Sequence, residues 1–139
     1  PGNLGTMIRT GEGAGITGVI MNQQTVDIFN SKTIRATMGS IFRVPFVYVP
    51  ELSTVLTQMH ERGIHTYAAH LKGQKYYDSF SFREPTAFLI GNEGNGLTKE
   101  ISDQAGQYLK IPMEGKVESL NASIAAALLM YEAHRQRNL

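Results

Sequence analysis

The 139-residue sequence contains no cysteine, which excludes a disulfide framework, a thiolate metal site and a cysteine nucleophile. It contains no apolar run of roughly 18 residues either, so we expect no membrane-spanning helix. Net positive charge is also scarce, because 13 Lys and Arg against 12 Asp and Glu give a net charge of +1. Domains that bind nucleic acid unaided usually carry a clear basic excess, so composition alone does not point to a nucleic-acid partner.

The residues that are present suit one folded domain. Hydrophobic residues make up 42% of the chain and charged residues 18%, as in a globular protein. A chain of this length buries about two-thirds of its unfolded surface. The sequence opens at Pro1 rather than at methionine, and we expect residues 1–139 to be one domain of a longer protein. Nothing favours secretion, so we expect a cytoplasmic protein.

Short, continuously apolar segments alternate with longer helical ones. The predicted strands are 16–21, 46–49, 64–68, 87–90 and 108–111. The predicted helices are 4–11, 32–41, 54–62, 99–105 and 120–137. Helix N-caps are predicted at Asn3, Ser31, Ser53, Thr98 and Ser119. This alternation favours an α/β fold with a mostly parallel sheet. The segment 71–85 has no clear period and is predicted to be a long polar and aromatic loop.

Two glycine clusters could contact phosphate or another ligand. The cluster 13–18 formally matches G-x-G-x-x-G, but it follows a predicted helix and enters a strand, whereas a dinucleotide site needs the reverse order. We therefore interpret it as a turn. The cluster 91–96 is better placed, because it follows the buried strand 87–90 and carries Glu93 in its centre. A ligand-binding loop and an ordinary glycine-rich turn both remain open for it.

Several polar residues elsewhere also admit two readings. Arg9 stands among apolar neighbours and is either a solvated side chain or a guanidinium that binds phosphate with two hydrogen bonds. Asn121 falls in the first turn of the last predicted helix, where asparagine has poor propensity, so a hydrogen-bonding role is plausible there. The four histidines show no metal-ligand spacing with carboxylates, and we expect no metal site.

Three segments together resemble the motifs of the SpoU, or TrmH, family of RNA ribose methyltransferases in the SPOUT superfamily. They are PGNLGTMIRT (1–10), FLIGNEGNGL (88–97) and IPMEGKVESLNASIAAALLMYE (111–132), in the family's order and spacing. The resemblance implies an α/β fold with a mostly parallel sheet, helices on both faces and a C-terminal deep trefoil knot. It also implies a homodimer that transfers the methyl group of S-adenosylmethionine to a ribose 2′-hydroxyl of ribosomal or transfer RNA.

By motif position, the resemblance assigns two groups of site residues. Gly91, Ile111 and Leu120 are similar to the family's cofactor-contacting residues, and Ala69 stands where some members have a threonine beside the cofactor. The family's polar constellation is matched by Asn3, Arg9, Glu93, Ser119 and Asn121. Arg9 resembles the residue usually proposed to activate the 2′-hydroxyl, and in a dimer it would come from the chain opposite the bound cofactor.

A guanidinium stays protonated in proteins, which makes a general-base role for Arg9 physically unfavourable. Our hypothesis is that Arg9 clamps an RNA phosphate and stabilises the developing alkoxide. Ser119 or water would then pass on the proton. Glu93 and Asn121 would orient the reacting groups.

Three other functions remain open: methylation of an RNA base nitrogen, non-catalytic RNA binding, and simple nucleotide binding by an α/β domain. Family members generally have a strand before the first motif, and many carry a separate N-terminal RNA-binding domain; neither is in this sequence. We therefore expect a catalytic and dimerising core that binds RNA weakly and with a shallow salt dependence. Local patches around Arg9, Arg35, Arg43 and Lys116 would contribute modestly.

Overall fold

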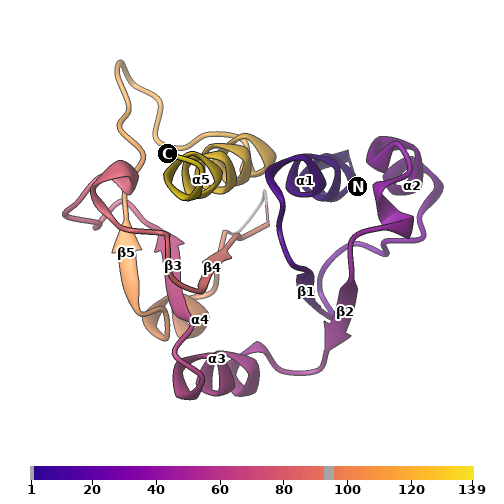
Figure 1. Ribbon diagram of the computed structural model, residues 1–139, viewed down its shortest axis with the longest axis horizontal. Helices are drawn as coiled ribbons and strands as arrows, with labels where there is room; N and C mark the ends of the chain where they lie inside the picture. The colour runs from indigo at the N-terminus through magenta and orange to yellow at the C-terminus, as the bar shows by residue number, and fades with distance from the viewer. Residues whose placement is uncertain (1, 93–95) are drawn as a thin grey trace. The chain divides into compact units, whose positions relative to one another are not determined.

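Parallel strand pairing, as predicted from the alternation of helices and short apolar segments, is present in the computed structural model of the chain (Figure 1). The structure describes residues 2–92 and 96–139. In these residues β1 (Val19–Asn22) pairs with β2 (Phe46–Val49), and β3 (His65–Ala69) lies between β4 (Thr86–Leu89) and β5 (Gln107–Leu109). The predicted strands therefore exist, although the first begins three residues later than expected.

Helices connect the strands. They are α1 (Gly2–Ala14), α2 (Ser31–Thr37), α3 (Leu52–Glu61), α4 (Lys99–Asp103) and α5 (Ala122–Arg137), with short 3-10 turns η1 (Ser40–Phe42) and η2 (Tyr77–Ser79). The chain divides into two compact units, Pro1–Leu52 and Ser53–Leu139. Within the described residues, no helix has the length and apolar character needed to cross a bilayer.

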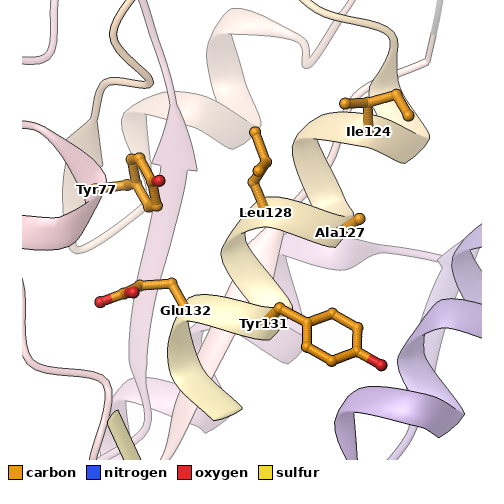
Figure 2. Close-up of a pocket in the computed structure, with 6 residues that line it drawn as sticks. All are labelled: Tyr77, Ile124, Ala127, Leu128, Tyr131 and Glu132. Atoms are coloured by element: carbon orange, nitrogen blue, oxygen red, sulfur yellow. The ribbon is translucent and has the colours of Figure 1, made fainter. Parts of the chain in front are cut away.

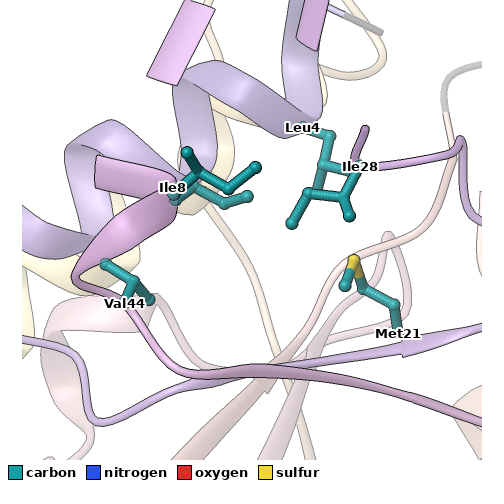
Figure 3. Packing of buried hydrophobic residues seen from close by; sticks show 6 residues of the cluster. Leu4, Ile8, Met21, Ile28 and Val44 are labelled. Carbon is teal, nitrogen blue, oxygen red and sulfur yellow. The ribbon is translucent and has the colours of Figure 1, made fainter. Parts of the chain in front are cut away.

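The first unit is built around one face of α1. Leu4 and Ile8 stand four residues apart and are both buried, because residues at this spacing share a helix face. Figure 3 shows the apolar cluster of Leu4, Ile8, Met21, Ile28 and Val44. Gly5 lies beside this cluster, where a Cβ would stand 2.5 Å from the Cβ of Ala36 on α2. Glycine at this position therefore lets the two helices approach closely.

The predicted helix 32–41 is shorter than expected at its C-terminal end. Met38 has φ 50° and Gly39 has φ 90°, so two successive left-handed residues end α2 at Thr37 and η1 follows. The predicted N-cap Ser31 is also wrong, because Asn30 caps the helix instead. Its Oδ1 accepts the backbone N–H of Lys32 at 2.9 Å.

The three-stranded sheet of the second unit has helices on both faces. Tyr67 of β3 packs in an apolar cluster with Leu129 of α5. The preceding residue, Thr66, has its Oγ1 2.8 Å from Nε2 of His60 on α3. Because successive side chains of a strand point to opposite faces, α5 covers one face of the sheet and α3 the other (Figure 1).

Leu129 is the one large apolar residue of helix α5 that is fully buried. The buried residues of this helix are Ser123, Ala126, Leu129 and Gln136. Ile124, Leu128 and Tyr131 form an exposed line on another side, here called the α5 stripe. The stripe lines one side of a groove with a volume of about 400 Å³. Figure 2 shows the residues of the stripe and Tyr77, which lines the other side of the groove.

The predicted loop 71–85 contains η2 and is tied to the end of α5. Gln136 is 8% exposed, and its Oε1 accepts the backbone N–H of Phe82 at 2.6 Å. Its Nε2 donates to the carbonyl of Phe80 at 2.9 Å, while Nε of Arg137 donates to the carbonyl of Phe82 at 2.8 Å. Because Phe82 is fully buried, these side chains supply partners that its backbone could not obtain from water.

Replacing Gln136 with leucine keeps the side chain's approximate size and removes three amide hydrogen bonds, those with Phe80 and Phe82 and a third that Nε2 donates to Glu132 at 2.8 Å. We expect the free energy of unfolding to fall by about 2–4 kcal/mol, because a buried N–H and a carbonyl lose their partners. Urea unfolding followed by circular dichroism measures the loss. Gln74→Leu is the matched control, because Gln74 is exposed, and it should change stability by no more than about 0.5 kcal/mol. Equal unfolding midpoints for the two variants would contradict this role of Gln136.

Candidate active site

Three predicted cofactor residues lie at one edge of the three-stranded sheet. Ala69 is the last residue of β3, Gly91 follows the end of β4 by two residues, and Ile111 follows the end of β5 by two. The strands are parallel and in register at this edge, and neighbouring strands lie about 4.8 Å apart. The three residues are therefore within reach of one small ligand, at the edge where parallel sheets bind ligands.

Gly91 marks the place where the chain after β4 folds back on itself. Asn92 and Gly96 form a bridge in which the Gly96 N–H donates to the Asn92 carbonyl at 3.0 Å. A Cβ on Gly91 would lie 2.2 Å from the carbonyl carbon of Gly96 and 2.2 Å from the nitrogen of Leu97. No side chain fits in that space, so the turn needs glycine at position 91. Glu93 lies outside the described residues.

Apolar side chains and backbone groups make up most of this edge. Ile111 is 9% exposed, and Leu120 is half-buried at the far end of the mostly exposed segment 112–119. Ala69 is exposed and adds a small apolar surface. Such a set suits a flat, largely apolar group with a few hydrogen-bonding atoms, as in a nucleoside. The described residues hold no group of three or more His, Cys, Asp or Glu that could bind a metal ion.

Asn121 caps α5, which corrects the prediction of Ser119 as the cap. Its Oδ1 accepts the backbone N–H of Ser123 at 2.8 Å and the hydroxyl of Ser123 at 2.6 Å. The helix begins at Ala122, directly after Asn121, and not at the predicted residue 120. Asparagine is therefore favourable at position 121, because it is the N-cap and lies outside the first turn. Ser119 lies two residues before the cap and is exposed, so its hydroxyl is accessible.

Asn3 and Arg9 both lie on α1, in the first unit. The helix begins at Gly2, so Asn3 is inside the first turn and is not its N-cap. The Nδ2 atom of Asn3 is buried and makes no hydrogen bond to the residues that the structure describes. Arg9 is exposed. Six residues of helix separate the two by about 9 Å of rise and about 120° of rotation, so they point to different sides of α1.

The predicted polar constellation is thus divided between the two units. Asn3 and Arg9 belong to the first, whereas Ser119 and Asn121 belong to the second. Asn3 and Arg9 lie on α1, and Ser119 and Asn121 lie just before α5. The structure brings Ser119 and Asn121 together at the start of α5.

An ion pair that sequence reasoning missed fixes the end of α1. Glu12 accepts hydrogen bonds from Nη2 of Arg43 at 2.9 Å and from the hydroxyl of Ser40 at 2.6 Å. Hydrogen bonds from Arg43, and then from Ser40, lower the pKa of Glu12 to about 2. The partners lie 28 and 31 residues away, so no local pattern reveals them. Arg43 was predicted to form part of a basic patch, but Glu12 balances its charge.

This ion pair predicts a pH dependence of stability. Because the pKa of Glu12 falls from 4.5 to about 2 on folding, its contribution is fully present above pH 4.5 and is lost as the pH falls through about 2. We expect Glu12→Gln to destabilise the protein at pH 7 and to cost progressively less below pH 4.5. Urea unfolding of both proteins from pH 7 to pH 2 measures the difference. A difference that stays constant over this range would contradict the assignment.

The sequence and the fold place this chain in a known family. A model of the SpoU rRNA methylase family matches residues 1–131, so the chain belongs to that family. It is 37% identical over 131 residues to the 23S rRNA (guanosine(2553)-2'-O)-methyltransferase RlmP of Bacillus subtilis (strain 168). The aligned segment covers 94% of this chain and 52% of that protein.

Solved structures agree. The SpoU methyltransferase AviRb from Streptomyces viridochromogenes matches with a TM-score of 0.92 and 35% identity, over 99% of this chain and 56% of that one. The AdoMet-bound rRNA methyltransferase from Sinorhizobium meliloti matches with a TM-score of 0.88 and 37% identity, over 97% and 52%. The α/β fold with parallel sheets is therefore confirmed. The chain spans about half the length of the curated relatives it matches.

Proposed function

We propose that this chain is the catalytic core of an S-adenosylmethionine-dependent methyltransferase that modifies a ribose 2′-hydroxyl in ribosomal or transfer RNA. The observation that carries the proposal is the backbone turn at Gly91, which lies at the sheet edge shared with Ala69 and Ile111. Membership of the SpoU rRNA methylase family supports it. So do the names of a 2'-O-methyltransferase relative and of an AdoMet-bound neighbour.

The residues at this edge fit the proposed cofactor. Ile111, Leu120 and Ala69 would pack around its adenosine, and the backbone beside Gly91 would supply hydrogen bonds. When bound, S-adenosylmethionine supplies a methyl group on a positively charged sulfur, so the receiving oxygen needs accurate placement more than strong activation. Ala69, Gly91, Ile111 and Leu120 themselves carry no charge.

The chain's polar residues would place the ribose and handle its proton. The fork of Arg9 would bind an RNA phosphate and stabilise negative charge on the 2′-oxygen. Ser119, whose hydroxyl is accessible, or a water molecule would accept the proton and pass it on. Asn121 uses its carbonyl oxygen to cap α5, so it can act on a ligand only through its amide N–H groups. Glu93 would be a second orienting group.

We also propose that the active form is a homodimer in which Arg9 comes from the chain opposite the cofactor. The exposed α5 stripe supports a contact between copies, because a line of Ile, Leu and Tyr is costly to leave in water. A C-terminal deep trefoil knot belongs to the same proposal, supported by the fold likeness to SpoU methyltransferases. A cytoplasmic location would suit an enzyme that acts on ribosomal or transfer RNA.

Isothermal titration tests the cofactor part of this proposal. We expect S-adenosylmethionine to bind with one site per chain and ATP to show no binding at the same concentration. Absence of S-adenosylmethionine binding would favour a non-catalytic RNA-binding module. Binding of ATP alone would favour a simple nucleotide-binding domain. The remaining alternative is methylation of a base nitrogen. It is distinguished from ribose methylation by the position of the methyl group in the RNA product.

A further inference from the structure

The loop that follows β3 is held rigidly against the end of β5. The N–H of Gly73 donates to the carbonyl of His70 at 2.9 Å, and the N–H of Lys72 donates to Nδ1 of His70 at 3.0 Å. The His70 ring stacks on the ring of Tyr108, with centroids 4.5 Å apart and planes 14° apart. A Cβ on Gly73 would lie 2.9 Å from the carbonyl carbon of Leu109, so the loop lies directly on β5.

Further along, the same loop pairs with β5 as a short parallel strand would. The N–H of Lys110 donates to the carbonyl of Lys75 at 3.0 Å, and the N–H of Tyr77 donates to the carbonyl of Lys110 at 2.9 Å. Tyr76 is therefore opposite Lys110, and their side chains project from the same side of the pair. Tyr76 is 50% exposed although its backbone is fixed. An aromatic and a basic side chain thus leave the backbone pair on the same side.

Lysines outnumber carboxylates around this pair, and Asp103 is an acidic neighbour whose Oδ1 accepts the hydroxyl of Tyr108 at 2.9 Å. The segments 70–77 and 106–113 contain three lysines and no carboxylate. Lys72 is exposed, and Lys110 is half-buried beside Tyr76. The ammonium of Lys75 lies 6.0 Å from the centre of the Phe80 ring, so it is directed toward the other face. This local excess contrasts with the nearly neutral chain as a whole.

We infer that this surface, made of His70, Leu71, Lys72, Tyr76, Tyr108 and Lys110, binds single-stranded RNA beside the methyl-transfer site. The inference rests on the proposed function. Exposed aromatic rings stack on unpaired bases, and lysines between them neutralise phosphates. His70 follows Ala69 and Lys110 precedes Ile111, so the surface lies at the same end of the strands as the proposed cofactor residues, on the neighbouring face. Nucleotides flanking the target would lie here, and a base would stack on Tyr76.

Fluorescence anisotropy with a labelled single-stranded oligoadenylate of about ten nucleotides tests the surface. At low salt we expect Tyr76→Ala to weaken binding about tenfold, whereas Tyr76→Phe keeps the ring and binds as the unaltered chain does. Lys110→Met should weaken binding and reduce the slope of log affinity against log salt by about 0.7. A blunt duplex of the same length should bind more weakly and should not distinguish Tyr76→Ala from the unaltered chain.

Arg62→Met is the matched control for charge. Arg62 is an exposed cation just before β3, at the opposite edge of the same sheet. Its removal should leave the affinity for the oligonucleotide within about twofold. Thermal unfolding should be the same for all four variants. If the unaltered chain does not bind the oligonucleotide, or if Tyr76→Ala and Arg62→Met bind equally, the inference is wrong.

Two further measurements separate this inference from the function on which it rests. Analytical sedimentation should give the same oligomeric state for Tyr76→Ala and the unaltered chain. If the variant changes its oligomeric state and keeps its RNA affinity, the surface forms contacts between copies and the inference is wrong. Titration with S-adenosylmethionine should give equal affinity for both proteins. If the chain binds the cofactor and methylates RNA, but Tyr76→Ala does not change the RNA affinity, only the RNA-binding role of the surface is refuted. If Tyr76→Ala and Lys110→Met weaken RNA binding as expected, but the chain does not bind S-adenosylmethionine, only the proposed methyltransferase function is refuted.

Discussion

Replacing Gly91 with alanine is expected to weaken S-adenosylmethionine binding about tenfold or more and to destabilise the second unit by about 1–3 kcal/mol. The added methyl group would lie 2.2 Å from backbone atoms of Gly96 and Leu97. Backbone cannot rotate away as a flexible side chain can, so the turn must open and its hydrogen-bonding groups must move. Isothermal titration measures the affinity, and urea unfolding measures the stability.

Gly63→Ala distinguishes a specific effect from general destabilisation. Gly63 has φ 76° and open space around it, so alanine there strains the backbone by about 1 kcal/mol and meets no neighbour. It stands before β3, at the edge of the sheet opposite Gly91. We expect this variant to lose stability and to retain normal cofactor affinity. If both variants weaken the cofactor in proportion to their loss of stability, Gly91 has no special place in the site.

Replacing Arg9 with alanine is expected to reduce the single-turnover rate of methyl transfer about 10²- to 10⁴-fold. The guanidinium would hold a phosphate through two hydrogen bonds while charge develops on the 2′-oxygen. Arg9→Lys retains the charge and loses the fork, so we expect it to recover only part of the rate. Arg9 is exposed, and neither variant should change the unfolding midpoint or the affinity for S-adenosylmethionine.

Lys32→Ala provides the control for Arg9. Lys32 is another exposed cation of the first unit, on α2, and its removal should leave the rate within about twofold. The rates should be measured with RNA at saturating concentration, so that weak RNA binding does not lower them. A near-normal rate for Arg9→Lys would exclude the fork, and a near-normal rate for Arg9→Ala would exclude any direct part for this residue.

The sequence predicted the elements well where local chemistry determines them. Strand β2 was predicted at its observed bounds, and parallel pairing followed from short apolar strands alternating with helices. Helix boundaries were less accurate, because caps depend on which of two neighbouring polar side chains reaches a free N–H. At the start of α5 that side chain is Asn121, not Ser119, and at α2 it is Asn30, not Ser31.

Contacts between distant segments could not be predicted. Nothing near Glu12 indicates Ser40 and Arg43 as its partners, and nothing near Phe82 indicates that Gln136 will bind its backbone. The three-to-four spacing of large apolar residues in 120–137 predicts a helix but does not indicate which side of it packs. Small residues such as Ala126 took the buried side, and the α5 stripe stayed exposed. The predicted site residues came from the family motifs, because such motifs combine residues that are distant in the sequence.

The near-neutral charge of the chain is compatible with an RNA substrate once charge is viewed locally. Glu12 neutralises Arg43, whereas Lys72, Lys75 and Lys110 around Tyr76 form no ion pair with the residues that the structure describes. The chain also spans about half the length of the relatives it matches. We therefore expect the isolated 139 residues to bind RNA weakly, with contacts restricted to a few phosphates.

Methyl transfer from labelled S-adenosylmethionine to total RNA, followed by complete alkaline hydrolysis, is the most direct test of the proposed reaction. Alkali cleaves RNA through attack by the 2′-hydroxyl, so a methylated 2′-oxygen protects the adjoining phosphodiester bond. We predict that the label appears in alkali-resistant dinucleotides and that Arg9→Ala reduces its rate of appearance at least about a hundredfold. Label in mononucleotides would show methylation of a base and would contradict the proposal that this chain modifies ribose.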